Sequence, residues 1–331
     1  MKCMTHGYDR RMMDEDPPFD AQTLRVMRAI ADTGSLTGAA AQLGYSQPAL
    51  SQQMRRLERR LGMPVVERVG RRLRLTEAGR VLARHAPAVA TALDAAAGEL
   101  AQLRGGARAT VRLAGFPSAS PTVVPRLLAQ LAAASPGLQL TYVEAEPPEA
   151  VAGVRADRAD VALTFSYPGD QSDPHGASAR GLDVSSIGAE ELLAVLPADH
   201  HLASLTAVDV ADLAQEHWIA GCPRCRGHLV EVCQRAGFAP RIRFETDNIA
   251  AVEGLVAQGI GVATLPRLAV ASFPPLAGIV TLPIVGGRQR TIHTVTAHGA
   301  ARIPAVAQVL GTLRTVVAEV TAAPGAPTPA N

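Results

Sequence analysis

The stretch "SQPALSQQMRRLERRLG", Ser46 to Gly62, has the pattern of a short helix with one apolar side. Ser46 is a favourable N-cap and Pro48 suits a first turn, so we expect a helix from Ser46 to Leu61. Its apolar residues recur at steps of four, three and four: Leu50, Met54, Leu57 and Leu61. That spacing aligns them on one buried stripe. The same helix holds four arginines within six residues, which either form a solvated surface or bind phosphate.

Two shorter helices precede this one in the sequence. The apolar spacing predicts a helix from Ala21 to Thr33, and Ser35 is a suitable N-cap for a second helix that ends at Leu43. Gly44, in "LGYS", supplies the tight turn before the third helix. Two short helices joined by a glycine turn are the layout of a helix-turn-helix.

The outward side chains at the start of the third helix have the chemistry needed to bind DNA. They are Gln47, Ser51, Gln52 and Arg55. Glutamine can form paired hydrogen bonds with adenine, serine can donate or accept, and arginine can reach phosphate or guanine. We therefore expect this surface to face the bases.

A basic hairpin is predicted directly after the third helix, in "MPVVERVGRRLRLTEAG". Its apolar positions are Val65, Val66, Val69, Leu73 and Leu75, and they frame a turn at Gly70. The tip carries Arg71 and Arg72, which would form a wing suited to a minor groove or to the flanking phosphates.

The charge of this region differs from that of the whole chain. Between Asp20 and Leu75 there are ten arginines and four acids, whereas the formal net charge of the chain is only +2. An arginine-rich helix on its own is usually a solvated surface. Here the helix pair, the polar first turn and the basic hairpin occur together, which favours binding to double-stranded DNA.

The segment from Phe19 to Gly79 resembles the winged helix-turn-helix of the LysR-type transcriptional regulators. The resemblance is carried by "GSLTGAAAQLGYSQPALSQQMRRLERRLG" and by "RLTEAG" with its preceding leucine, and a weaker similarity extends to about Thr321. It implies a winged helix-turn-helix, a long helix that dimerises, and an effector-binding domain, usually assembled as a tetramer.

The resemblance also implies roles for individual residues. Those that would face the bases are Gln47, Pro48, Ser51 and Gln52, and those that would hold the DNA backbone are Ser35, Thr37 and Arg55. Two positions depart from the family pattern. Gln52 stands where the family often has arginine, so no base preference carries over. Val65 and Val66 stand where the family usually has Leu-Phe, so the apolar side chains at these two core positions are smaller.

The composition is that of a soluble globular protein with room for two or three cores: 331 residues, 47% apolar and 19% charged. We expect residues 1–18 and 322–331 to be disordered, because they are polar or rich in proline and alanine. The N-terminus lacks the apolar run of an export signal, and no uninterrupted apolar stretch reaches the roughly 18 residues of a membrane span. We therefore expect a cytoplasmic protein with no membrane partner.

A long helical pattern follows the hairpin, from Thr76 to a glycine stop at Gly105, and predicts a linker helix over residues 77–106. Pro87 should kink this helix or mark a turn. The apolar positions form a narrow seam: Val81, Leu82, Val89, Leu93, Leu100 and Leu103. The seam predicts a partner helix in a homodimer or homotetramer, and the alternative is that the helix packs on its own domain.

From Ala109 onward, strand and helix patterns alternate, which indicates an α/β sheet. No dinucleotide motif, phosphate-binding loop or serine elbow occurs, so we expect neither an enzyme nor a bound cofactor. The resemblance implies a two-lobed domain like a periplasmic binding protein. The expected domains are the winged helix-turn-helix over 19–76 and the effector domain over 107–321, with lobe I over 109–188 and 287–321 and lobe II over 189–286.

Ligands in such folds bind between the lobes, at strand ends and helix N-termini. The candidate effector-binding residues are Ser118, Ser120, Thr164, Phe165 and Asn248, in "GFPSASPT", "TFSY" and "TDN". Serines ahead of a helix would suit a small-molecule effector with a carboxylate or other anionic group. For any one serine or asparagine here, helix capping alone is an equally good explanation.

The stretch "CPRCRGHLVEVC" supports more than one interpretation. Cys222 and Cys225 have the spacing of redox and zinc motifs, but a second pair of ligands is missing, and we predict no metal site. On one helix, Cys225 and Cys233 would be about 12 Å apart and could not form a disulfide. Peroxide-sensing members of the family carry cysteines nearby at a different spacing. We favour structural thiols, with a thiol-based redox sensor using Cys222, Cys225 and Cys233 as the alternative.

Overall fold

A computed structural model describes residues 17–69, 72–103, 109–169, 175–272, 274, 276–287 and 289–322. The chain divides into two compact units, Met1–Ala90 and Thr91–Asn331. The terminal segments for which we predicted disorder lie almost wholly outside the described residues, and so does Arg71.

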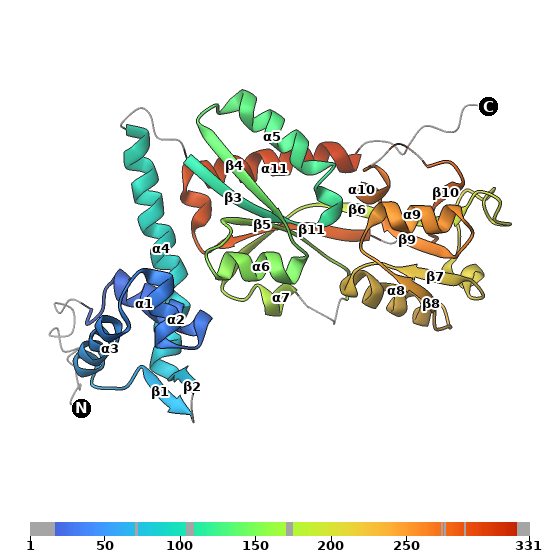
Figure 1. Cartoon of the computed structure of the whole chain (residues 1–331). Coiled ribbons are helices and arrows are strands. Elements are labelled where there is room, and N and C mark those ends of the chain that lie inside the picture. Colours follow the sequence, from blue (N-terminus) through green and yellow to red (C-terminus); the bar gives the residue numbers. More distant parts are fainter. Residues whose placement is uncertain are drawn as a thin grey trace, which may run out of the picture. The chain divides into compact units, whose positions relative to one another are not determined.

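The first unit contains the three predicted helices followed by a hairpin (Figure 1). Its elements are α1 (Ala21–Thr33), α2 (Leu36–Leu43), α3 (Gln47–Leu61), β1 (Val66–Val69) and β2 (Arg72–Leu75). The side chains of Asp20, Ser35 and Ser46 each accept a backbone N–H at the start of the helix that follows. Gly44, between α2 and α3, has a φ of 71°, a conformation that favours glycine. The predicted helix-turn-helix and hairpin are confirmed.

The apolar stripe predicted on α3 is the side that the first unit buries. Its buried residues are Leu50, Met54 and Leu57, which belong to one core cluster with residues of α1. Leu61, in the last turn, is only partly buried. Glu58 connects α3 to the hairpin, because its Oε1 accepts the backbone N–H of Val65 at 3.0 Å.

Helix α4 (Glu77–Leu103) crosses the boundary between the two units, and it continues through Pro87. Leu82 is 6% exposed and belongs to the core of the first unit. Leu93 and Leu100 are 55% and 59% exposed. The first part of α4 therefore packs on its own unit, as the alternative interpretation expected, whereas the later part keeps an apolar surface.

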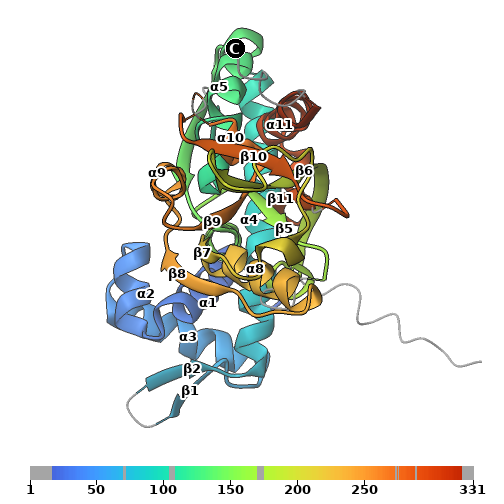
Figure 2. The same cartoon turned by 90° about the vertical axis from the view of Figure 1, so that its right-hand side faces the viewer.

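The second unit is the predicted α/β structure (Figure 1 and Figure 2). Its strands are β3 (Ala109–Gly115), β4 (Leu138–Glu144), β5 (Val161–Ser166), β6 (Leu182–Pro197), β7 (His217–Ala220), β8 (Arg241–Glu245), β9 (Val262–Pro266), β10 (Ile279–Pro283) and β11 (Gln289–Ala297). They form one sheet in the order β4-β3-β5-β11-β6-β9-β7-β8, and β10 pairs with β6.

Helices cover both faces of this sheet. They are α5 (Val123–Ala134), α6 (Pro147–Arg155), α7 (His175–Ser178), α8 (Pro223–Arg235), α9 (Ile249–Ala257), α10 (Arg267–Val270) and α11 (Pro304–Ala322), with short 3-10 turns at Pro117–Ala119, Val210–Leu213 and Ala300–Arg302. Figure 1 shows α5 and α11 on one face of the strands of lobe I and α6 on the other. In lobe II, α8 and α9 lie on opposite sides of the strands (Figure 1).

Strand β6 joins the two predicted lobes. It pairs with β11 over most of its length and with β9 and β10 toward its C-terminal end. The largest core cluster includes Leu163 of lobe I and Trp218 of lobe II. The two lobes therefore share part of one apolar core.

Helix α11 is long and apolar enough to cross a membrane, by length and composition alone, and it is the one such helix in the described part of the chain. Four of its residues have no exposed surface, namely Val309, Leu313, Val316 and Val317, and they belong to the largest core cluster. A buried stripe on an otherwise more polar helix is typical of a helix that packs on a globular core.

A buried ion pair lies where β11 meets β6. Arg290 and Glu190 are direct cross-strand partners, and each is 2% exposed. Arg290 Nη2 lies 2.7 Å from Glu190 Oε1, and Glu190 Oε2 accepts the backbone N–H of Leu268 at 2.8 Å. Burial alone would lower the pKa of Arg290, but the charge of Glu190 and its other neighbours raise it overall. The guanidinium therefore stays charged inside the protein.

The same guanidinium contacts two aromatic rings and a hydroxyl. Arg290 Cζ lies 4.2 Å from the centre of the Phe165 ring and 4.8 Å from that of Phe116, at cation–π distance. Arg290 Nη2 also donates to Ser118 Oγ at 2.6 Å. One cation thus connects β11, β6, β5 and the segment after β3.

Arg290→Met should lower the free energy of unfolding of the second unit by about 3–5 kcal/mol, because it leaves the Glu190 carboxylate buried without its cation. Adding Glu190→Gln should recover much of the loss, since a neutral amide can still accept the Leu268 N–H. Fluorescence of the single tryptophan, Trp218, during chemical denaturation reports on this unit.

The matched control is Arg226→Ala, which breaks an ion pair with Glu245 whose side chains are 48% and 55% exposed. It should change the free energy of unfolding by less than about 1 kcal/mol. If Arg290→Met costs no more than this control, the buried pair does not have the structural importance assigned to it.

Candidate functional site

The first turns of α3 present polar side chains to solvent. Gln47, Pro48, Gln52 and Arg55 are exposed and Ser51 is partly buried. Their spacing places them together on one side of the helix, away from its buried stripe. Groups that can bind base edges and phosphates therefore share one surface.

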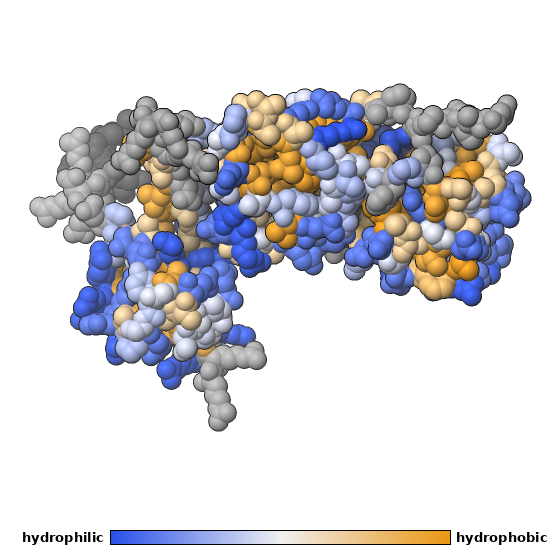
Figure 3. Space-filling model, turned by 45° about the horizontal axis from the view of Figure 1, so that its top comes forward, coloured by the Kyte–Doolittle hydropathy of each residue, from blue (hydrophilic) through white to orange (hydrophobic). Residues whose placement is uncertain are grey.

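Positive charge extends along the same helix. Arg56, Arg59 and Arg60 are all exposed, and Arg59 Nε donates to the backbone carbonyl of Arg55 at 3.3 Å. Figure 3 shows hydrophilic residues over much of the visible surface of the first unit. The exposed arginines of α3 supply the positive charge that binds DNA phosphates.

The other predicted DNA contacts are placed only in part. Thr37 is exposed in the first turn of α2, whereas the Ser35 hydroxyl oxygen already accepts the Gly38 N–H as an N-cap at 3.0 Å. A serine that accepts there can still donate its own proton. Strands β1 and β2 are antiparallel, as a wing requires, but Arg71 and the side chain of Arg72 lie outside what the structure describes.

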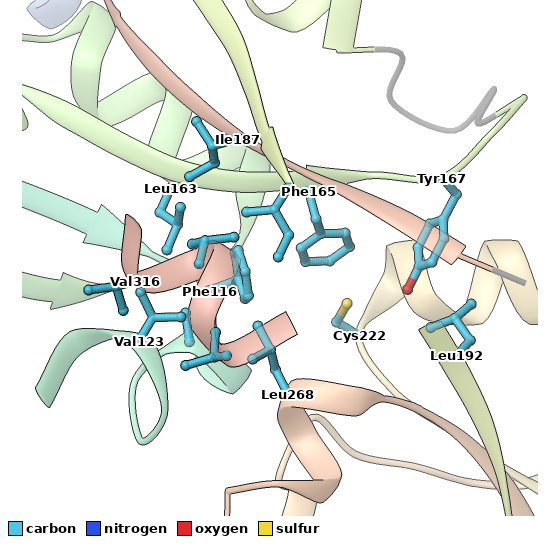
Figure 4. Close-up of a cluster of buried hydrophobic side chains, with 14 of the residues drawn as sticks. Phe116, Val123, Leu163, Phe165, Tyr167, Ile187, Leu192, Cys222, Leu268 and Val316 are labelled. Carbon is cyan, nitrogen blue, oxygen red and sulfur yellow. The ribbon is translucent and has the colours of Figure 1, made fainter. Parts of the chain in front are cut away.

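In the second unit, a pocket of about 60 Å³ lies between the predicted lobes. Segments far apart in the sequence line it, and its lining residues include Phe116, Ser118, Glu146, Phe165, Tyr167, Cys222, Cys225, His228, Ile249 and Arg290. The Phe116 and Phe165 rings meet edge to face with centres 5.2 Å apart. Figure 4 shows both rings with Tyr167 and Cys222.

Two of the five predicted effector residues line this pocket, Ser118 and Phe165. Ser118 is 6% exposed, and its hydroxyl accepts a hydrogen bond from Arg290. It lies in a 3-10 turn of three residues, and α5 begins only at Val123, so Ser118 is not at the N-terminus of that helix. Thr164, next to Phe165 on β5, has no exposed surface and does not line the pocket.

The other two predicted residues, Ser120 and Asn248, line an adjoining, more open hollow together with Glu144 and Asp247. It shares Pro117, Asp247 and Ile249 with the pocket. The Ser120 hydroxyl donates to Glu144 Oε2 at 2.5 Å. Asn248 caps α9, because its Oδ1 accepts the Ala251 N–H at 3.2 Å. Two acidic residues make this hollow a poor site for an anion.

Two thiols meet at the start of α8. Cys222 is the N-cap and Cys225 lies in the first turn, and the Cys222 thiol donates to Cys225 with 3.1 Å between the two Sγ atoms. The Tyr167 hydroxyl also donates to Cys225 Sγ, at 3.4 Å, and the Tyr167 ring stacks on His228. The spacing of the cysteines suggested a pair, but the tyrosine contact could not be predicted from the sequence.

These contacts separate the pKa values of the thiols. The hydrogen bond from Cys222 lowers the pKa of Cys225 most, and the charge of Arg290 lowers it further, although burial acts in the opposite direction. The pKa of Cys222 is raised, first because it donates to Cys225 and then by burial. Burial raises the pKa of Cys233 to about 12. Of these three thiols, Cys225 is therefore the one that favours the thiolate form.

Glu146 is a pocket residue that the sequence analysis missed. It precedes α6, and its Oε2 is buried with no hydrogen-bond partner among the described residues. Burial raises the pKa of its carboxyl, while a hydrogen bond from Cys222 and the charge of Arg290 oppose the increase. Nothing in "EAEPPEA" distinguishes this glutamate from an ordinary surface acid.

One group of side chains in the described part of the chain has the proximity of metal ligands: His200, His201 and Glu216, whose ligand atoms lie within 4.8 Å of one another. However, His200 Nδ1 accepts the Leu202 N–H at 3.2 Å, so the ring proton is on Nε2, which faces Glu216 at 3.5 Å. A protonated nitrogen has no lone pair for a metal. This geometry fits a histidine–carboxylate contact better than a metal site.

Comparison with known proteins identifies both units. Residues 21–80 match the family model of the bacterial regulatory helix-turn-helix protein, lysR family, and residues 104–318 match that of the LysR substrate binding domain. A probable hydrogen peroxide-inducible genes activator of Mycobacterium avium is 34% identical over 252 residues, which are 75% of this chain and 78% of that protein.

Solved structures share the fold. Full-length OxyR C199D from Pseudomonas aeruginosa has a TM-score of 0.65 at 22% identity and covers 92% of this chain and 96% of its own. Full-length CbnR, in complex with its target DNA, has a TM-score of 0.52 at 22% identity and covers 90% of this chain and 100% of its own. With both family models matched along the chain, this protein belongs to the LysR family of DNA-binding transcriptional regulators.

Proposed function

We propose that this regulator binds an operator through α3 and the β1–β2 hairpin, and that the state of the pocket between the lobes controls that binding. The observation that carries the proposal is the buried Arg290, which lies in the pocket wall and holds residues of both lobes. The exposed Leu93 and Leu100 of α4 would contact a partner helix in a homodimer or homotetramer. The small number of cysteines, four in 331 residues, fits a cytoplasmic protein.

The DNA contacts in this proposal come from α3, from the start of α2 and from the residues predicted at the tip of the hairpin. Base edges would be contacted by Gln47, Pro48, Ser51 and Gln52, and the DNA backbone by Ser35, Thr37, Arg55, Arg71 and Arg72. The amides and hydroxyls can discriminate among bases, whereas the arginines bind phosphates of any sequence.

A small-molecule effector in the pocket is the first candidate signal. The pocket offers the aromatic ring of Phe165 and the Ser118–Arg290 pair. Because Glu190 already offsets the charge of Arg290, a small neutral or weakly acidic molecule fits this wall better than a strongly anionic one.

A reaction of the thiols is the second candidate signal, and the contact between the Cys222 and Cys225 sulfurs favours it. The pocket has a volume of about 60 Å³, and a cavity of about 10–15 Å³ on this measure holds one water, so hydrogen peroxide can enter it. The Mycobacterium avium relative is named as a probable activator of hydrogen peroxide-inducible genes.

For the DNA surface, Arg55→Ala should weaken binding to every duplex, because one phosphate contact is lost. The slope of the logarithm of the binding constant against the logarithm of the salt concentration should become shallower by about one unit. Gln47→Ala and Gln52→Ala should each cost about 1–3 kcal/mol on the operator alone. Fluorescence anisotropy with operator and random duplexes measures both effects.

Arg126→Ala is the control, because it removes an exposed arginine of α5 in the second unit and should leave both quantities unchanged. Equal losses on operator and random duplex for all three α3 variants would contradict the assigned roles.

For the pocket, a compound that raises the melting temperature in a screen of small acids and neutral metabolites should lose about 1–3 kcal/mol of affinity in Ser118→Ala, because a polar partner is removed. Asn248→Ala should leave the affinity unchanged, since Asn248 lines the other hollow. Calorimetry on the full chain compares the two variants, and the opposite pattern would place the effector in that hollow.

For the thiols, hydrogen peroxide should change the operator affinity or footprint of the reduced protein, and dithiothreitol should reverse the change. Cys225→Ser should not respond, whereas Cys233→Ser should respond like the wild type because Cys233 is fully buried in the core. A response that persists in Cys225→Ser would rule out this thiol as the sensor.

A further inference from the structure

We propose that Cys222 and Cys225 form one dithiol–disulfide couple, in which Cys225 attacks the oxidant, Cys222 closes the disulfide and Glu146 takes the proton of Cys222. This inference rests on the second candidate signal above and deepens it by assigning a role to each residue.

The geometry favours a bond between these two sulfurs. Their Sγ atoms are 3.1 Å apart, and a disulfide needs about 2.05 Å, so a shift of about 1 Å completes the bond. Both residues lie at the start of α8, so the helix can stay folded when the bond forms. The product is therefore accessible from the structure as it stands.

Cys233 is excluded as the partner by the same helix. It lies eight residues after Cys225 on α8, which corresponds to about 12 Å of rise. It has no exposed surface and packs in the largest core cluster. A bond between Cys225 and Cys233 would require α8 to unfold, which the Cys222 pairing does not.

The surroundings of the two sulfurs assign their roles. Cys225 is partly exposed, accepts hydrogen bonds from Cys222 and Tyr167, and is stabilised as a thiolate by Arg290. The thiolate is the nucleophilic form of cysteine. Cys222 is 7% exposed and keeps its proton as the donor of the pair. Cys225 therefore attacks, and Cys222 acts second.

The two steps balance with hydrogen peroxide as the oxidant. The Cys225 thiol first gives its proton to solvent. The thiolate then attacks one peroxide oxygen, an S–O bond forms, the O–O bond breaks, and the hydroxide released takes up that proton and leaves as water. Cys225 is then a sulfenic acid. Cys222 next attacks the Cys225 sulfur, an S–S bond forms, the S–O bond breaks, and a second hydroxide leaves. The two sulfurs are oxidised by two electrons in total, and the peroxide is reduced to two molecules of water.

Glu146 is placed to transfer the proton in the second step. Glu146 lines the same pocket as Cys222 and lies within hydrogen-bond reach of that thiol, whose single proton can turn from Cys225 to the carboxyl. Its Oε2 is buried with no hydrogen-bond partner among the described side chains. The carboxylate can take the Cys222 proton as that sulfur attacks, and it can pass the proton to the leaving hydroxide. The second step thus proceeds without an isolated charge in the buried pocket.

Trypsin separates the three thiols, because it cleaves after Arg224, Arg226 and Arg235 and leaves Cys222, Cys225 and Cys233 in different peptides. After treatment of the reduced full chain with hydrogen peroxide and blocking of free thiols, mass spectrometry should find the Cys222 peptide linked to the Cys225 peptide. Cys222→Ser should accumulate sulfenic acid on Cys225 that dimedone traps, and Cys233→Ser should form the same link as the wild type.

Glu146→Gln should slow disulfide closure by on the order of 100-fold and leave the first step unchanged, so sulfenic acid accumulates in the presence of Cys222. A merely structural role for Glu146 would not separate the two steps. Glu146→Asp should restore part of the closure rate. The control Glu149→Gln, an exposed acid in the first turn of α6, should react like the wild type.

The outcomes distinguish this inference from the function on which it rests. A peroxide response carried by a link through Cys233, or by a link between two chains, overturns the pairing but keeps thiol sensing. If no thiol is oxidised while operator binding is normal, thiol sensing and the pairing both fail and DNA binding stands. If Glu146→Gln slows neither step, the proton-transfer role is wrong.

Discussion

The second unit depends on the ion pair between Arg290 and Glu190. Two charges without solvent are costly unless each is paired and hydrogen-bonded, and here the guanidinium has a carboxylate, a serine hydroxyl and two aromatic rings. The pair lies between β6 and β11, where the lobes join. The walls of the pocket are therefore held by the same contact that holds the lobes.

The DNA-binding unit could be predicted from its sequence almost residue by residue. Its signals are local: Ser35 and Ser46 cap the helices that follow them, Gly44 makes the turn, and the apolar steps along α3 mark its buried side. Each signal acts within about one or two helical turns, where periodicity and capping are informative. The prediction fails in part at the end of the stripe, because Leu61 lies in the last turn of α3, at the edge of the core, and is only partly buried.

The pocket could be predicted as a place but not as a set of side chains. Strand ends and helix starts indicated Ser118 and Phe165, which do line it. The partner of Ser118 is Arg290, which is 172 residues away in the sequence. No sequence pattern near either residue predicts that contact. Asn248 turned out to cap α9 in a different hollow, because a capping asparagine and a ligand-binding one look the same in a sequence. Glu146 was missed because only burial distinguishes it from a surface acid.

The thiol chemistry proposed for the pocket requires that the pocket stabilise a thiolate on Cys225. The groups that face this sulfur are Cys222 and Tyr167, which donate to it, Arg290, which attracts the thiolate, and Glu146, which opposes it. The most direct test is the rate of alkylation of each cysteine by iodoacetamide as a function of pH, in the reduced full chain. We predict that Cys225 reacts with a midpoint below the pKa of about 8.5 for a free thiol, while Cys222 and Cys233 stay unmodified at neutral pH. A Cys225 midpoint at or above that value would contradict it.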